Sequence, residues 1–256
     1  MSRIICVSNQ KGGVGKTTTA INVGAALAES DASVLLVDLD ARADLSGYLG
    51  IVPATGASGV YEALFDGETD LRDVIVTAPW YGLQVAPATI DLAAAEMLLV
   101  QSPPTERHQV VAQAIAPVAA EYDYVILDSP PGLQLLAVSA LAASDEVLVP
   151  QQCSFLALHG LRQLSQSIER IQQELNADLR ISGIVMTMQD RRTIHHRQVI
   201  EMVKEGFPGL VMESVIPATI RLQEAAAAGE PILVYEPEGP AAQAYRQLAK
   251  ELIDRG

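Results

Sequence analysis

The sequence has 256 residues, a formal net charge of −14 and 49% hydrophobic residues. This length is sufficient for one α/β domain with a large buried core, and we expect a single domain over residues 1–256. The chain lacks the run of about 18 apolar residues that a membrane-spanning helix needs, and its acidic balance argues against indiscriminate binding to polyanions.

The first apolar run, residues 3–7, predicts a β-strand that begins almost at the N-terminus. We therefore expect no removable signal peptide and a cytoplasmic protein. Cys6 and Cys153 stand far apart in apolar surroundings, so we expect two buried thiols rather than a disulfide or a metal pair.

A glycine-rich segment follows this strand directly, and it is the strongest motif in the chain. Residues 10–18 read Gln-Lys-Gly-Gly-Val-Gly-Lys-Thr-Thr and lead into a helical pattern over 16–29. A glycine turn between a strand and a helix presents backbone N–H groups and the helix dipole to an anion. Lys16 is expected to reach the β- and γ-phosphates of a nucleotide, and the Thr17 hydroxyl to bind Mg²⁺. Gln10 stands where the general phosphate-loop pattern has glycine, and Lys11 adds a second lysine, so a narrower pattern is matched.

Strand-like and helical segments alternate along the rest of the chain. The strand-like runs are nearly continuous in Val, Ile and Leu, which is typical of a parallel sheet buried on both faces. The order predicts one doubly wound, mostly parallel α/β sheet flanked by helices, with the site beyond the carboxyl ends of the strands. Strands are predicted at 3–7, 33–38, 82–85, 122–128, 146–150, 180–188 and 210–216. Helices are predicted at 16–29, 91–100, 107–121, 133–143, 156–175, 194–206 and 241–254, and an Ala-rich helical piece at 224–229 ends in a glycine stop.

Carboxylates stand at the ends of two of these strands. Asp38 and Asp40 follow the second strand, and Asp128 ends the fourth. Mg²⁺ prefers oxygen ligands, and Asp128 fits that role best, whereas Asp38 and Asp40 are candidates for orienting an attacking water. Aspartates at strand ends also cap turns, and only the neighbouring glycine-rich loop favours the functional interpretation.

Further along the chain, residues 191–197 contain three arginines and two histidines. This is the densest positive segment, and it predicts a sequence-independent phosphate-binding patch that includes Arg191, Arg192 and Arg197. The alternative is a solvated helix start whose arginines pair with Asp190 and Glu201.

Three motifs of this chain resemble those of the ParA/MinD group of deviant-loop ATPases, in the short ParA form without an N-terminal helix-turn-helix. The resemblance rests on residues 11–17, 38–40 and 128–131, and it continues through 152–161, 185–188, 216–217, 221–222 and 224–225.

The resemblance implies an ATP-dependent cycle with ATP and Mg²⁺ as cofactors. Two subunits would close around two ATP molecules, with Lys11 reaching the partner's phosphates. Asp40 would orient the water, Asp38 would support Mg²⁺ through water, and Thr18 would contact the α-phosphate. The implied nucleotide-binding residues are Lys11, Gly12, Gly13, Val14, Gly15, Lys16, Thr17 and Thr18, with Met188 and Pro217 beside the base and Gly132 near the γ-phosphate.

The implied function is a partition or positioning ATPase that binds nucleoid DNA non-specifically in its ATP state. A ParB-like or cargo-adaptor protein would stimulate a weak intrinsic hydrolysis. Arg192 and Arg221 match the DNA-contacting arginines of the family.

The chain departs from the family pattern at several positions. Ala41-Arg42 replaces the usual Pro-Gln, Ala218-Thr219 replaces Arg-Asn, and Glu230 replaces a common lysine. The first change concerns the rigidity of the loop after Asp40 and the hydrolysis rate, and the others remove positive charge from the expected DNA face.

Other functions fit the same motifs. The cargo could be a plasmid, a chromosome or a protein body such as a carboxysome or a chemoreceptor cluster. A MinD-like membrane-surface ATPase would need a basic amphipathic C-terminal helix, but residues 245–255 are mixed in charge and spaced for packing, so no stable membrane insertion is expected. An iron–sulfur reductase or an ATP-dependent synthetase is a third class, and Cys6 and Cys153 are poorly placed for a cluster.

Overall fold

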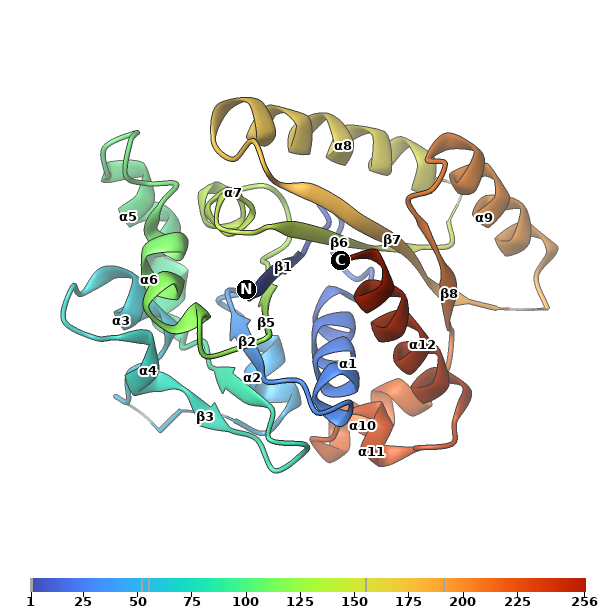
Figure 1. Ribbon diagram of the computed structural model, residues 1–256, viewed down its shortest axis with the longest axis horizontal. Coiled ribbons are helices and arrows are strands. Elements are labelled where there is room, and N and C mark those ends of the chain that lie inside the picture. Colours follow the sequence, from blue (N-terminus) through green and yellow to red (C-terminus); the bar gives the residue numbers. More distant parts are fainter. Residues whose placement is uncertain (1, 52, 55, 155, 191) are drawn as a thin grey trace.

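A central eight-stranded sheet organises the molecule, as the computed structural model shows (Figure 1). The structure describes residues 2–51, 53–54, 56–154, 156–190 and 192–256. The strands lie in the order β3-β4-β2-β5-β1-β6-β7-β8, and every neighbouring pair except β3 and β4 is parallel. The predicted doubly wound, mostly parallel sheet is confirmed.

The strands match the predicted apolar runs closely. They are β1 (Arg3–Val7), β2 (Val34–Asp38), β3 (Val76–Thr77), β4 (Gln84–Ala86), β5 (Tyr124–Asp128), β6 (Glu146–Gln152), β7 (Arg180–Gln189) and β8 (Val211–Pro217). The sequence did not predict β3, because it has two residues, both exposed, and pairs antiparallel at the edge of the sheet.

The long helices also fall where they were predicted. They are α1 (Lys16–Glu29), α6 (Val110–Ala119), α7 (Leu135–Ala142), α8 (Ala157–Glu174), α9 (Ile194–Gly206), α10 (Arg221–Ala228) and α12 (Pro240–Arg255). Gly229 ends α10 in the left-handed region, at a φ of 75°, as the predicted glycine stop requires.

The shorter helices show where the sequence pattern was less informative. The helix predicted at 91–100 is instead a 3₁₀-helix, η1 (Ile90–Ala94), followed by α5 (Ala95–Gln101). The helices α2 (Asp44–Tyr48), α3 (Val60–Phe65), α4 (Leu71–Val74) and α11 (Ile232–Tyr235) were not predicted. Elements of four to six residues are too short to display a helical period.

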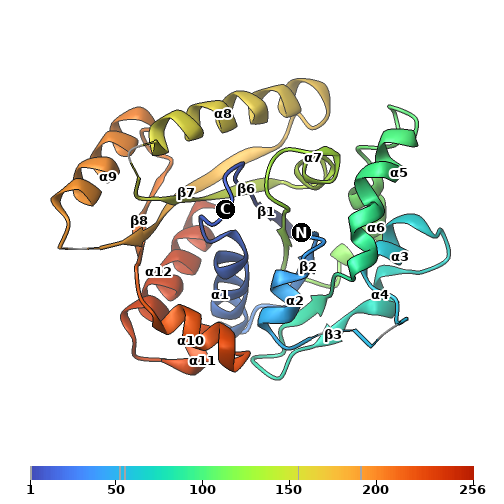
Figure 2. The same cartoon turned by 180° about the vertical axis from the view of Figure 1, so that it is seen from behind.

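Helices cover both faces of the sheet. On one face α1 and α12 pack with α2, α10 and α11, and on the other face α3 to α9 surround a second apolar core (Figure 2). Helix α1 lies very close to the sheet, and Gly24 permits this approach: a Cβ at this position would be only 2.6 Å from Leu36 Cδ2. Within the described residues, no helix is long and apolar enough to cross a membrane.

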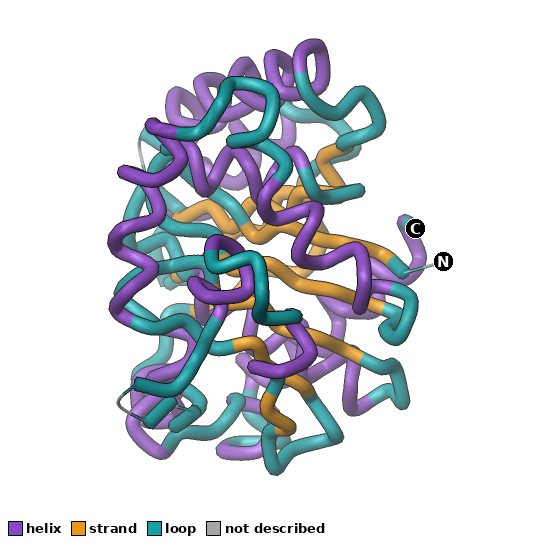
Figure 3. Tube along the Cα trace, turned by 90° about the vertical axis from the view of Figure 1, so that its left-hand side faces the viewer, coloured by secondary structure: helices purple, strands orange, loops and turns teal. Residues whose placement is uncertain are grey.

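The edge-on view shows how the ends of the sheet differ. The two termini lie side by side at the end where the strands begin (Figure 3). The loops after β1, β2 and β5 leave the sheet at the opposite end, because these strands are parallel and in register. The candidate site lies at that carboxyl end.

Candidate functional site

The glycine-rich loop connects β1 to α1, and no side chain covers the backbone at its glycines. Gly13 and Gly15 have φ angles of 71° and 91°, which favour glycine. Apart from the glycine and its two chain neighbours, no described atom lies within 4 Å of the position that a Cβ would take at Gly12, Gly13 or Gly15. Gly15 is the N-cap of α1 and uses no side chain to satisfy the first N–H groups of the helix. The loop therefore offers backbone donors and a helix N-terminus to an anion.

Contacts that the sequence did not predict hold this loop in place. Asn9 donates to the Pro150 carbonyl at 2.7 Å and accepts from the Lys11 N–H at 3.1 Å. The Thr187 hydroxyl donates to the Val14 carbonyl at 2.8 Å. The Gly132 N–H, in the loop after β5, donates to the Gln10 carbonyl at 3.2 Å.

The two lysines of the loop have different environments. Lys16 is 7% exposed and its Nζ donates to the Lys11 carbonyl at 3.4 Å. Burial lowers the pKa of Lys16, while the charges of Asp128 and Asp40 oppose this shift. Lys11 is exposed, and its Nζ donates to Gln152 Oε1 at 3.4 Å. Lys16 therefore points into the site and Lys11 lies on the surface around it.

Asp38 and Asp128 are paired neighbours at the ends of β2 and β5, and both are fully buried. Asp38 Oδ2 accepts from the Ser46 hydroxyl at 2.6 Å and from the Ser46 N–H at 3.0 Å, and Oδ1 accepts from the Asp40 N–H at 3.1 Å. Burial raises the pKa of Asp38 to about 6 despite these donors. Ser46, on α2, had not been predicted as part of the site.

Asp128 is the least satisfied carboxylate of the site. Neither Oδ1 nor Oδ2 has a hydrogen-bond partner within the described part of the chain. Burial and the charge of Asp38 raise the pKa of Asp128 well above its usual range, and the charge of Lys16 only partly offsets them. A buried carboxylate without a partner, next to a threonine hydroxyl and a second carboxylate, fits a hard cation with oxygen ligands. The donor set thus agrees with Mg²⁺ at Thr17, Asp38 and Asp128.

Asp40 is also buried, at 4% exposed, but it has a close partner. Arg42 donates from Nη2 to Asp40 Oδ2 at 2.8 Å and, from its backbone N–H, to Oδ1 at 3.0 Å. The same Nη2 lies 3.0 Å from Asp44 Oδ2.

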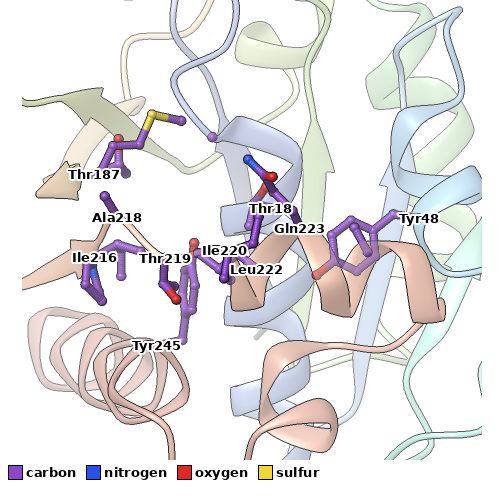
Figure 4. A pocket seen from close by; sticks show the side chains of 14 residues that line it. Thr18, Tyr48, Thr187, Ile216, Ala218, Thr219, Ile220, Leu222, Gln223 and Tyr245 are labelled. Carbon is purple, nitrogen blue, oxygen red and sulfur yellow. The ribbon is translucent and has the colours of Figure 1, made fainter.

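A mostly apolar cavity of about 560 Å³ lies beside the loop. Met188 and Pro217, which the family resemblance implies lie beside the base, both line it, together with Gly15 and Thr18 of the phosphate loop. Figure 4 shows side chains reaching this space from α1, α2, β8, α10 and α12. Tyr48, from α2, is a further lining residue that the sequence did not indicate.

The basic segment follows β7, which is separated in the sheet from β2 and β5, the strands that lead to Asp38, Asp40 and Asp128. Gln189 and Pro217 are paired neighbours on β7 and β8, so the segments that carry Arg192 and Arg221 leave the sheet side by side. Arg192 is 91% exposed and lies 3.1 Å from Asp190, as the alternative interpretation predicted. Arg221 contacts Glu224 at 2.8 Å and Glu236 at 3.4 Å.

Two arginines and two cysteines are the remaining positions that the sequence analysis singled out. Arg197 is exposed on α9, and Arg191 lies outside the described residues. Cys6 and Cys153 are buried free thiols, and burial raises their pKa values to about 12 and about 11. The described residues contain no cluster of three or more His, Cys, Asp or Glu side chains that could hold a metal, and the site inferred above for Mg²⁺ combines two carboxylates with a threonine hydroxyl.

Comparisons with known proteins agree with this geometry. A family described as "AAA domain" matches residues 2–181, and one described as "4Fe-4S iron sulfur cluster binding proteins, NifH/frxC family" matches residues 134–256. The chain is 45% identical to the sporulation initiation inhibitor protein Soj of Bacillus subtilis, over 100% of both chains. It is 43% identical to the chromosome partitioning protein ParA of Myxococcus xanthus, over 100% of this chain and 89% of that protein.

A similar solved structure is the cobyrinic acid a,c-diamide synthase of Mycobacterium smegmatis with a bound ATP analogue and magnesium. It superposes with a TM-score of 0.85 at 37% identity, over 98% of this chain and 93% of that one.

Proposed function

This chain belongs to the ParA/Soj/MinD family of P-loop ATPases, and we propose that it is an ATP-switched positioning ATPase acting as one domain over residues 1–256. In the proposed cycle, ATP closes two subunits face to face, and the dimer binds duplex DNA without sequence preference. A ParB-like or cargo-adaptor protein then stimulates hydrolysis and releases the dimer. This cycle would segregate plasmid or chromosomal DNA, and it places the protein on the nucleoid.

The contrast between Lys11 and Lys16 carries the proposal. Lys16 is buried among carboxylates inside its own site, whereas Lys11 is exposed and has one long contact, 3.4 Å, to Gln152. An exposed lysine on a rigidly anchored loop can leave its own subunit's surface and reach phosphates across an interface. A cation supplied in this way stabilises the charge that develops on the transferred phosphoryl group.

ATP and Mg²⁺ fit the observed arrangement. The bare backbone from Gly12 to Gly15 and the Lys16 ammonium would hold the phosphates, Thr18 would contact the α-phosphate, and the cavity at Met188 and Pro217 would hold the base. Thr17, Asp38 and Asp128 would hold Mg²⁺, which supplies charge neutralisation at the phosphates when bound.

Hydrolysis requires a group that orients water, and we assign this role to Asp40. Its carboxylate lies on the loop after β2 and contributes to the potential at the buried Lys16 ammonium. The Gly132 N–H donates to the Gln10 carbonyl of the phosphate loop, and it would sense the γ-phosphate by exchanging this bond for one to a phosphate oxygen.

The proposed DNA surface consists of the adjacent segments after β7 and β8, with Arg191, Arg192, Arg197 and Arg221 as its cations. Arg192 and Arg221 are paired with carboxylates, so DNA phosphates have to compete with these internal partners. The molecule is also strongly acidic overall. We therefore expect modest, strongly salt-dependent affinity without base recognition.

The decisive experiment measures binding to random-sequence duplex DNA with ATP, ADP or no nucleotide, across a salt titration. Binding that needs ATP and collapses as salt rises is the expected result. Arg192→Ala should weaken binding equally on all sequences and reduce the salt slope by about one phosphate contact. Arg72→Ala, on the distant helix α4, is the matched control and should change neither. Absence of binding in every nucleotide state, or a sequence-selective loss in Arg192→Ala, would contradict the proposed DNA surface.

The reduced basic charge at Ala218 and Glu230 favours a second candidate, in which the same ATPase cycle positions a protein cargo such as a carboxysome or a chemoreceptor cluster. This candidate would be supported if the protein bound such an assembly and if its deletion did not change the rate of plasmid loss. A membrane-surface role is less well supported, because α12 buries Tyr245, Leu248 and Leu252 against the domain. A liposome sedimentation assay tests it.

The similarity to the diamide synthase provides a third candidate, an ATP-dependent ligase. ATP turnover measured with and without cobyrinic acid and an ammonia donor separates it from the positioning ATPase. Turnover that depends on those substrates would replace our proposal.

A further inference from the structure

Arg42 stands out because it contacts the carboxylate to which we assign the water-orienting role. Its Nη2 donates to Asp40 Oδ2 at 2.8 Å, and its Nε lies 3.3 Å from Oδ1 and 3.2 Å from Oδ2. The backbone N–H of Arg42 donates to Oδ1 at 3.0 Å. One residue thus contacts both oxygens of Asp40 with side chain and backbone.

These contacts place a donor of Arg42 on each oxygen of the carboxylate. An ionised carboxylate has about four lone-pair sites, and three N–H groups of Arg42 point at them: the backbone N–H at Oδ1, Nη2 at Oδ2, and Nε shared between the two. A water that is to be oriented for attack would have to bond an oxygen that already accepts from Arg42. In the described conformation neither oxygen of Asp40 is free of Arg42, and in this sense Asp40 is masked.

The masking contact is built to be reversible. The Arg42 side chain is 61% exposed, and the same Nη2 lies 3.0 Å from Asp44 Oδ2, on a side chain that is 47% exposed. Asp40 raises the pKa of Arg42, so the guanidinium remains charged throughout. Arg42 can therefore move from the buried Asp40 to the exposed Asp44 without losing a charged partner, because both carboxylates are already within contact distance.

We propose that Arg42 is a positioning residue that masks Asp40 and holds the basal rate of ATP hydrolysis down, and that its transfer to Asp44 unmasks the carboxylate. This inference rests on the ATPase function proposed above and adds the restraint on its rate. The predicted direction is that weakening the contact between Arg42 and Asp40 accelerates ATP hydrolysis, and that strengthening this contact slows it. A partner protein that offers a carboxylate to Arg42 would accelerate turnover in the same way.

The test measures kcat and KM for ATP hydrolysis in four variants of the full chain. Arg42→Gln removes the charge, and we expect kcat to rise roughly two- to five-fold, which corresponds to about 0.4–1 kcal/mol, with KM unchanged. Arg42→Lys retains the charge but loses the forked geometry, so its kcat should lie between those of wild type and Arg42→Gln. Asp44→Asn removes the competing carboxylate and should lower kcat. Arg72→Gln is the matched control, because Arg72 also bonds an aspartate two residues earlier, Asp70, but lies far from the site.

The two kinetic constants separate masking from a general loss of structure. A general loss of structure in Arg42→Gln would lower kcat or raise KM, whereas release of Asp40 raises kcat and leaves KM unchanged.

The outcomes distinguish the two proposals. Wild-type turnover with an equal or lower kcat in Arg42→Gln would overturn the masking role and leave the ATPase function intact. A raised KM in Arg42→Gln, or a faster Asp44→Asn variant, would overturn it as well. Absence of ATP hydrolysis in wild type and in every variant would instead overturn the proposed ATPase function, and the masking role with it.

Discussion

Ser46 provides a test of how the site is held together, because its hydroxyl serves two buried groups at once. It donates to Asp38 Oδ2 at 2.6 Å and accepts from the Ala88 N–H at 3.1 Å. Ser46, Asp38 and Ala88 are all at most 1% exposed, so water cannot readily replace the hydroxyl. Ser46→Ala removes both bonds with minimal change in volume.

The expected loss of stability follows from these two bonds. A hydrogen bond to a charged group contributes about 1.5–3 kcal/mol, and a buried N–H left without a partner costs about 1–3 kcal/mol. The free energy of unfolding should therefore fall by roughly 3–5 kcal/mol, and Tm by roughly 10 °C for a chain of this size. Asp38 retains the N–H donors of Ser46 and Asp40, which keeps the loss from being larger.

The loss should also depend on pH. The pKa of Asp38 is about 6 in the folded protein, above its unfolded value of about 3.9. The stability associated with this raised pKa is fully present below about pH 3.9 and is lost as pH rises through about 6. Ser46→Ala removes a donor that favours the charged form and raises the pKa of Asp38 further. The difference from wild type should therefore be larger at pH 8 than at pH 5.

Urea unfolding at both pH values, without nucleotide, measures this effect. Ser102→Ala is the control, because the Ser102 hydroxyl bonds the Leu98 carbonyl at a partly exposed helix end and its loss should change stability by less than about 0.5 kcal/mol. A loss below about 1 kcal/mol in Ser46→Ala, or a larger deficit at pH 5 than at pH 8, would refute the reasoning.

Three further changes test other parts of the site and fold. Lys16→Ala should abolish the thermal stabilisation by Mg·ATP, because the phosphates lose their buried cation; unchanged ATP affinity would contradict this assignment. Asp40→Ala should slow hydrolysis and accumulate an ATP-bound dimer in size-exclusion chromatography, and normal turnover would remove Asp40 from the mechanism. Glu146 is buried, but Arg3 and Arg180, each at 2.9 Å, outweigh that burial and hold its pKa below the usual range. Glu146→Gln should lower the free energy of unfolding by about 2 kcal/mol at pH 7, and by less as pH falls below about 4 and wild type loses the same charge.

The parts of the molecule that depend on local sequence could be predicted. Buried parallel strands are continuous apolar runs, and the turn at residues 10–18 needs glycines at fixed positions, so both are visible in a single sequence. Met188 and Pro217 both line the cavity, and their position beside the base, which the family resemblance implies, stays a prediction.

The parts that depend on long-range contacts could not be predicted. Thr187 supports the phosphate loop from 173 residues away, and Asn9 bonds Pro150 from 141 residues away. Ser46 belongs to a five-residue helix without a recognisable period. Arg42 was recognised as a departure from the family pattern, but only the structure shows its guanidinium on Asp40.

The unpartnered carboxylate of Asp128 has a consequence for the lifetime of the protein in a cell. It ends β5, a strand in the middle of the sheet, so its unfavourable burial weakens the same element on which the fold depends. A bound cation would relieve this cost in the native state alone, because the unfolded chain does not assemble the site. Molecules without nucleotide and Mg²⁺ would therefore open more often and be degraded first. We expect the cellular half-life of this protein to follow the supply of its nucleotide, so that molecules without nucleotide are degraded before those that have it bound.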